Sequence, residues 1–282
     1  MWRKTREMSS LSNITSDLVI ERPELWSLSL SISKKGVRFA LYCTEQDNSL
    51  IARDIPFDDG EGPTLKKLEN AIYDNPILLN DYKTTRISVE SMQFMLIPPE
   101  YAGESEEIME TMYPRHESDL ASCTLDSSDG ISIAYLAESG IMAFLSRTFP
   151  DAKICHHLRA ETEYYQSKQE EGTTMGRMYI TLVGERLDVV VFSRGELRFA
   201  NSFMFSNIND AAYFALAAWS DTGLDSMSDE VQLYGDKESR EKLTPILQRY
   251  ISYVVPGIFP AQALSIGNDA VKAPIDIIYL SL

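Results

Sequence analysis

Residues 26–43, WSLSLSISKKGVRFALYC, alternate apolar and polar side chains around a short turn, and residues 176–193, GRMYITLVGERLDVVVFS, follow the same plan. Six apolar positions of the first stretch recur 150 positions later in the second: Leu28, Leu30, Ile32, Val37, Phe39 and Leu41 match Met178, Ile180, Leu182, Leu187, Val189 and Val191. Apolar residues also match between 51–57 and 199–205, after a turn that is shorter in the second copy. A period of two is typical of half-buried β-strands. The sequence therefore predicts a three-strand meander that occurs twice.

The composition is that of a folded protein with a strong acidic excess. The chain has 282 residues, 44% hydrophobic and 24% charged, which suits two domains or two halves of one bilobed unit. Its net charge of −16 argues against nucleic acid and against an anionic membrane surface as partners. Three scattered cysteines without a CxxC motif favour a reducing compartment. We therefore expect a soluble, cytoplasmic protein that does not insert into a membrane.

The rest of the chain is expected to complete two lobes, residues 1–172 and 173–282. Helices are predicted at 63–73 and 210–221, one after each meander. Between the meanders, a strand is expected at about 87–97 and a short helix near 104–112. The block at about 121–159 is read as strand, turn, strand, helix, strand, and residues 171–174 as the hinge between the lobes. Apolar runs at 263–266 and 275–280 are predicted as the last strands.

This order of elements resembles the actin-like ATPase superfamily, which includes sugar kinases, actins and heat-shock chaperones. The block at 121–159 is similar to the extra subdomain of its bacterial branch, seen in FtsA, PilM and GspL. The segments 94–98 (FMLIP), 213–224 and 233–236 (LYGD) also resemble an uncharacterised bacterial domain-of-unknown-function family to which an actin-like fold has been attributed. The resemblance implies an α/β protein with a duplicated ribonuclease-H-like, actin-like fold and an extra small α/β subdomain in the first half.

The phosphate-binding motifs of active relatives are damaged here. In such proteins the first turn of each meander carries an acidic residue beside glycine, to organise magnesium and water. The first turn, residues 31–36 (SISKKG), has no carboxylate, and in the second turn Glu185 follows the glycine instead of preceding it. The loop that binds adenosine in this superfamily would have two adjacent glycines after a strand. This chain has a single glycine, Gly235, followed by Asp236. We therefore expect that hydrolysis is lost, with no bound cofactor beyond a vestigial ATP and magnesium site.

The residues that a vestigial nucleotide site would use are Lys34, Gly36, Gly184, Glu185, Gly235 and Asp236. For both meander turns, plain hairpin chemistry is the simpler interpretation. His156 and His157 beside Cys155 suggest zinc, but adjacent strand residues point to opposite faces, so we predict no metal site. We also predict no catalytic residue. The acidic stretch 58–61 lacks the spacing of a calcium loop.

The favoured hypothesis is a non-catalytic cytoplasmic adaptor or scaffold that binds a protein partner. The alternative is an adenine-nucleotide-binding ATPase or kinase-like phosphotransferase whose acid is Asp188 or Asp236. A metal-dependent hydrolase would need clustered carboxylates that the sequence lacks. We expect the open edge of the 121–159 block to bind the partner by strand addition, unless residues 1–20 cover that edge. Self-association is left open.

Overall fold

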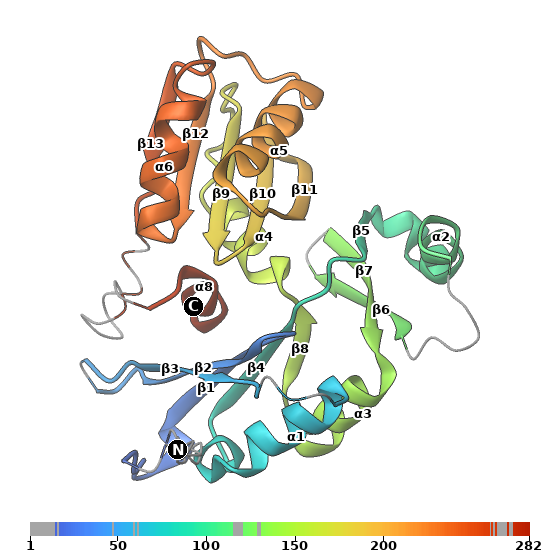
Figure 1. The fold of residues 1–282 in the computed structure, drawn as a ribbon, viewed down its shortest axis with the longest axis vertical. Helices are drawn as coiled ribbons and strands as arrows, with labels where there is room; N and C mark the ends of the chain where they lie inside the picture. The colour runs from blue at the N-terminus through green and yellow to red at the C-terminus, as the bar shows by residue number, and fades with distance from the viewer. Residues whose placement is uncertain are drawn as a thin grey trace, which may run out of the picture.

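The computed structural model of the chain describes residues 15, 17–46, 48–58, 60, 62–114, 121–128, 131–259, 261, 263, 270 and 273–282. Within these ranges the backbone forms two five-stranded sheets and one three-stranded sheet. Figure 1 shows the two large sheets in separate lobes, one above the other, with the small sheet beside the lower lobe. The lower lobe, built from the first half of the chain, is called the first lobe, and the upper one the second lobe.

The first lobe is a mixed sheet with helices on its outer face. Its elements are η1 (Pro23–Leu25), β1 (Trp26–Ser33), β2 (Gly36–Cys43), β3 (Ile51–Pro56), α1 (Thr64–Tyr73), η2 (Pro76–Leu79), β4 (Thr84–Val89), α3 (Ser139–Thr148) and β8 (Lys153–His156). The strands lie in the order β3-β2-β1-β4-β8. Alternate apolar side chains of β1 pack with buried residues of α1 and α3, which gives this lobe its own core.

The second lobe repeats this plan. Its elements are β9 (Arg177–Val183), β10 (Arg186–Ser193), β11 (Glu196–Met204), α5 (Ile208–Asp221), β12 (Glu230–Gly235), α6 (Lys237–Leu247) and β13 (Tyr253–Pro256). The order β11-β10-β9-β12-β13 matches the first lobe strand for strand. Leu30 lies opposite Phe39, and Ile180 lies opposite Val189 at the same offset. The predicted duplication of the meander is confirmed.

The small sheet beside the first lobe differs from the predicted block. It contains β5 (Phe94–Ile97), β6 (Ala121–Ser128) and β7 (Ile131–Glu138) in the order β5-β7-β6, next to η3 (Pro99–Glu104) and α2 (Ser105–Met112). The expected block at 121–159 is therefore not one unit, because α3 packs in the first-lobe core and β8 pairs with β4. The expected single strand at 87–97 is two strands of different sheets. The chain turns between them at Ser91, whose hydroxyl donates to the Leu136 carbonyl over 2.7 Å.

Two helices cross between the lobes. Helix α4 (Leu158–Gln166) follows the last strand of the first lobe and packs on the inner face of the second-lobe sheet, whereas α8 (Ile275–Ser281) packs on the inner face of the first-lobe sheet. Figure 1 shows both helices between the two sheets. The predicted strand at 275–280 is wrong: its apolar residues are all buried, as a helix enclosed on every side requires. The predicted hinge at 171–174 comes after α4, and the chain has already passed from the first lobe to the second along that helix.

The N-terminal segment, where it is described, lies on the first lobe. Leu18 and Ile20 pack against the first-lobe core, and Asp17 forms an ion pair with Arg53 of β3 at 2.8 Å. Residues 1–14 and 16, which belong to the segment expected as an alternative cover for the small sheet, lie outside the described residues. The predicted strand at 263–266 falls there too, apart from Ala263.

Candidate functional site

The first turns of the two meanders meet where the lobes join. Lys34 and Lys35 connect β1 to β2, and Gly184 and Glu185 connect β9 to β10. The Lys35 Nζ lies 2.5 Å from Glu185 Oε2, so this pair links positions that are 150 residues apart, the offset of the repeat. The Lys35 ammonium holds the pKa of the exposed Glu185 carboxyl below its ordinary value. The turns that would hold phosphate in a nucleotide-binding relative are thus joined to each other.

The other predicted residues of the first turn have local roles. Lys34 is exposed in the turn and has no ion pair within the described residues. Gly36 begins β2, and a Cβ atom there would lie 2.4 Å from the Ile55 carbonyl oxygen. Close packing of β2 against β3 therefore explains the glycine without any ligand.

Gly235 and Asp236 stand at the end of β12, directly behind the second turn. A Cβ atom on Gly235 would lie 1.9 Å from the Leu182 carbonyl oxygen, and its φ of +86° also favours glycine. The Asp236 amide donates to the same carbonyl over 2.9 Å, and its Oδ2 accepts the Gly184 amide at 2.8 Å. The structure thus brings Gly184, Asp236 and Glu185 together, and one oxygen of the exposed Asp236 carboxylate accepts a backbone amide of the turn.

A buried ion network lies beneath the two turns and connects the lobes. Arg186, the first residue of β10, forms ion pairs with Asp188 at 2.9 Å and with Glu90, which follows β4 of the first lobe. The Arg186 side chain is 6% exposed and the Asp188 side chain 0%. Burial alone would lower the pKa of Arg186, but the nearby Asp188 and Glu90 carboxylates raise it above its ordinary value. One guanidinium therefore pairs with a carboxylate from each lobe.

Asp188, the alternative acid of the sequence analysis, is fully committed to this network. The Ser202 hydroxyl donates to its Oδ1 over 2.6 Å, and His157 Nε2 lies 2.9 Å from the Ser202 oxygen. Burial would raise the pKa of Asp188, but Arg186 and His157 lower it below its ordinary value. A paired carboxylate with a lowered pKa is a poor proton acceptor at neutral pH.

Glu161 is the exception among the buried acids. It lies on α4 and is 1% exposed, near Thr181 and on the side of the helix that faces the ion network. Burial, and then the negative charge of Asp188, raise the pKa of Glu161 well above its ordinary value. The raised pKa favours the neutral carboxylic acid, the form that can lie buried between the lobes.

The expected orientation of the two histidines is wrong. His156 ends β8 and His157 precedes α4, so the alternation of a strand stops between them and their ring centroids lie 4.1 Å apart. His156 Nε2 lies 3.0 Å from the Ser91 carbonyl, and burial lowers the pKa of both rings. Among the described residues there is no group of three or more His, Cys, Asp or Glu side chains that could hold a metal ion.

Sequence reasoning missed Arg186, Glu90 and Glu161. The signal for Arg186 was present, because RLD opens a strand whose other residues are apolar, and a charge in such a strand needs a buried partner. Glu90 and Glu161 gave no comparable signal, since each lies in a stretch with other charged or polar residues. Only the fold brings them toward Arg186.

The sequence profile of the family described as "Protein of unknown function (DUF3822)" matches residues 15–254. The chain belongs to this family. No curated protein matches the sequence. A solved structure from Bacteroides thetaiotaomicron VPI-5482, a protein with an actin-like ATPase fold and unknown function, is 22% identical with a TM-score of 0.73, covering 92% of this chain and 97% of that one.

A second solved structure, the PilM-PilN type IV pilus biogenesis complex, is 12% identical with a TM-score of 0.53 and covers 92% of this chain and 99% of that chain. Together with the repeated sheets, these similarities show that this DUF3822 member has the actin-like fold with its two lobes. Within the described residues, none of the helices is long and apolar enough to span a membrane.

Proposed function

We propose that this protein is a non-catalytic, actin-like cytoplasmic adaptor that works by binding another protein. The supporting observation is the state of the carboxylates at the lobe junction. Glu185 is paired with Lys35, Glu90 and Asp188 share Arg186, and Asp236 accepts a backbone amide. Magnesium takes oxygen ligands that are free to coordinate it. Metal binding by Glu90 or Asp188 would compete with Arg186, and binding by Glu185 would compete with Lys35, whereas the exposed Asp236 is engaged through Oδ2 alone.

The alternative, an adenine-nucleotide-binding protein, is favoured by one feature of the same junction. The Lys35 and Glu185 side chains are 73% and 62% exposed, and an exposed ion pair contributes little to stability. A phosphate group could therefore replace Glu185 beside the Lys35 ammonium. Such binding would leave the buried pairs of Arg186 intact and would not restore hydrolysis.

Thermal unfolding with ATP and magnesium separates the two functions. A ligand at a hundred times its Kd adds about 2.7 kcal/mol to the free energy of unfolding, so even modest nucleotide binding raises the Tm. We expect no increase in Tm and no phosphate release above a buffer control. An increase that disappears in Lys35→Gln but persists in Lys66→Gln, an exposed lysine of α1, would establish the alternative.

The small sheet supports the adaptor role. Its order is β5-β7-β6, so β6 is an edge strand, and Leu125 on it is 38% exposed. The PilM-PilN structure is, by its description, a complex. We infer that the partner contacts β6 at the exposed Leu125 side chain.

Substitution on the edge tests this surface. Leu125→Lys places a charge on β6, and Met204→Lys is the matched control, because Met204 is 50% exposed on the edge strand β11 of the second lobe. Neither change should alter the Tm. A partner captured from the native host by the wild-type protein should be lost with Leu125→Lys and kept with Met204→Lys. Equal capture by both variants would refute β6 as the binding surface.

A further inference from the structure

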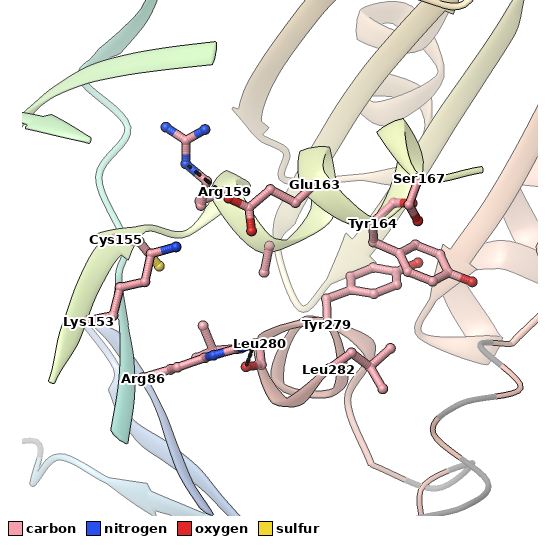
Figure 2. Close-up of a pocket in the computed structure, with 11 residues that line it drawn as sticks. Arg86, Lys153, Cys155, Arg159, Glu163, Tyr164, Ser167, Tyr279, Leu280 and Leu282 are labelled. Atoms are coloured by element: carbon pink, nitrogen blue, oxygen red, sulfur yellow. Dashed lines mark hydrogen bonds and ion pairs between the residues drawn. The ribbon is translucent and has the colours of Figure 1, made fainter. Parts of the chain in front are cut away.

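A cavity of about 370 Å³ lies away from the two turns, between the inner face of the first-lobe sheet and the two crossing helices. Strands β4 and β8 form one wall, and α4 and α8 form the others (Figure 2). Its size is near the lower end of the range for small-molecule sites. None of the residues discussed for the lobe junction lines it.

The strand side of this cavity is cationic in a protein of net charge −16. Arg86 of β4 and Lys153 of β8 line it, while Arg159 and Glu163, the one acidic side chain among the lining residues, belong to α4. Figure 2 shows Arg86 and Lys153 on the strand side and Arg159 on α4. Because Arg159 is paired with Asp126 and Glu163, the local excess of positive charge comes from Arg86 and Lys153, opposite in sign to the molecule as a whole.

These cations are incompletely neutralised. Lys153 has no ion pair in the described part of the chain, and the guanidinium of Arg86 donates only to the Leu280 carbonyl, over 3.4 Å. Arg159 is 1% exposed and is already paired with Asp126 at 3.1 Å and with Glu163 at 4.0 Å. An anion beside Arg86 and Lys153 would gain charge-assisted hydrogen bonds that these side chains do not make within the described residues.

The opposite side of the cavity is apolar and aromatic. The Tyr164 and Tyr279 rings stack with centroids 4.7 Å apart, and Leu282 lies next to them in Figure 2. The Tyr279 hydroxyl bonds to the Tyr165 hydroxyl at 2.8 Å, which satisfies the polar end of that ring. This wall therefore offers ring faces and edges to a flat or apolar group.

Covalent chemistry in the cavity is disfavoured. Cys155 lines it, but burial and the negative charge of Asp126 raise the pKa of its thiol to about 12. The thiolate, which is the reactive form, is therefore absent at neutral pH. Any ligand is held by charge and contact alone.

We propose that this cavity binds a small organic anion, a carboxylate or phosphate monoester that carries an aromatic or apolar group. The anionic group lies beside Arg86 and Lys153, and the apolar group lies against Tyr164 and Tyr279. No residue that lines the cavity belongs to β6, although Arg159 pairs with Asp126 of that strand, and the two proposals are tested by different measurements.

Calorimetric titration with matched probes tests it. Phenyl phosphate and benzoate should bind with Kd values of about 1 mM or below, and inorganic phosphate and the neutral benzamide at least about tenfold more weakly. Affinity for the two anions should fall as salt is added. Failure of both aromatic anions to bind at about 10 mM overturns the proposal, and equal binding of benzamide refutes the role of charge.

Variants locate the site. The double variant Arg86→Gln and Lys153→Gln should weaken phenyl phosphate binding at least about tenfold, because both side chains are exposed and their loss should not disturb the fold. Lys66→Gln removes one exposed cation on the outer helix α1 and should leave the Kd unchanged. Lys35→Gln should also leave it unchanged. Loss of binding with Lys35→Gln would place the anion at the turns and overturn the assignment. Unchanged binding by the double variant would overturn it as well.

Discussion

Replacing Arg186 by methionine should be among the most destabilising single changes in this chain. The methionine keeps most of the apolar stem but removes the charge that Asp188 and Glu90 share. Removing one partner of a buried ion pair costs about 3–5 kcal/mol, because the remaining charge is left uncompensated. A folded protein of this kind has a free energy of unfolding of about 5–15 kcal/mol, so the loss is a large fraction of the total.

The pH dependence identifies the cause. With Arg186 present, the pKa of Asp188 is lowered, so its contribution to stability is present above the unfolded pKa and is lost as pH falls through the folded value. Without Arg186, burial is expected to raise that pKa, and the carboxyl then favours unfolding increasingly as pH rises. The deficit of Arg186→Met should therefore grow between about pH 4.5 and 8.

Urea unfolding at several pH values, monitored by circular dichroism, provides the assay. Arg198→Met is the control, because Arg198 is 48% exposed and pairs with the exposed Glu196 at 2.8 Å, and it should cost about 1 kcal/mol or less. Adding Asp188→Asn to Arg186→Met should recover part of the loss. A deficit below about 1 kcal/mol, or one that does not change with pH, would refute the account of the buried network.

Three other changes have defined outcomes. Glu161→Gln should raise the Tm at pH 8 and leave it nearly unchanged at pH 4, because the raised pKa of Glu161 gives stability that is lost as pH rises; a shift equal at both values would contradict this. Gly235→Ala should cost about 3 kcal/mol or more in urea unfolding, since its Cβ would meet Leu182, whereas Gly184→Ala, with φ +59° but open space, should cost about 1 kcal/mol. Asn207→Ala removes the side chain that caps α5 by accepting two backbone amides and should cost about 1 kcal/mol, measured in the same way.

The duplicated meanders could be predicted because their apolar residues point to one side of each sheet, so a period of two survives in both copies. Helix α8 could not, because a short segment buried on all sides loses its periodicity, and Ile275, Ile277 and Ile278 favour a strand locally. The change of sheet at Ser91 could not be predicted either, because the residues on both sides of it favour strands. Helix α1 was predictable because one of its faces remains in water.

The candidate site was predictable only in its local parts. Turn residues such as Gly184 and Gly235 are marked by glycine, which the backbone requires there. The partner of a charged residue is not marked, because it is set by contacts between distant segments: Lys35 meets Glu185, and Arg186 meets Glu90, only after the lobes assemble. The cationic cavity was missed for the same reason, since Arg86, Lys153 and Arg159 come from three elements.

The exchange of α4 and α8 between the lobes makes each half of the chain structurally dependent on the other. The first-lobe sheet has its inner face covered by a helix from the end of the chain, and the second-lobe sheet is covered by a helix that precedes it. A fragment ending at the junction would expose an apolar face and would carry an unsheltered helix. Two copies of one half could cover each other only by trading that helix, as in a swapped dimer. The repeat is therefore a symmetric pair held in a single chain, and separating the halves should yield aggregation rather than two small folded proteins.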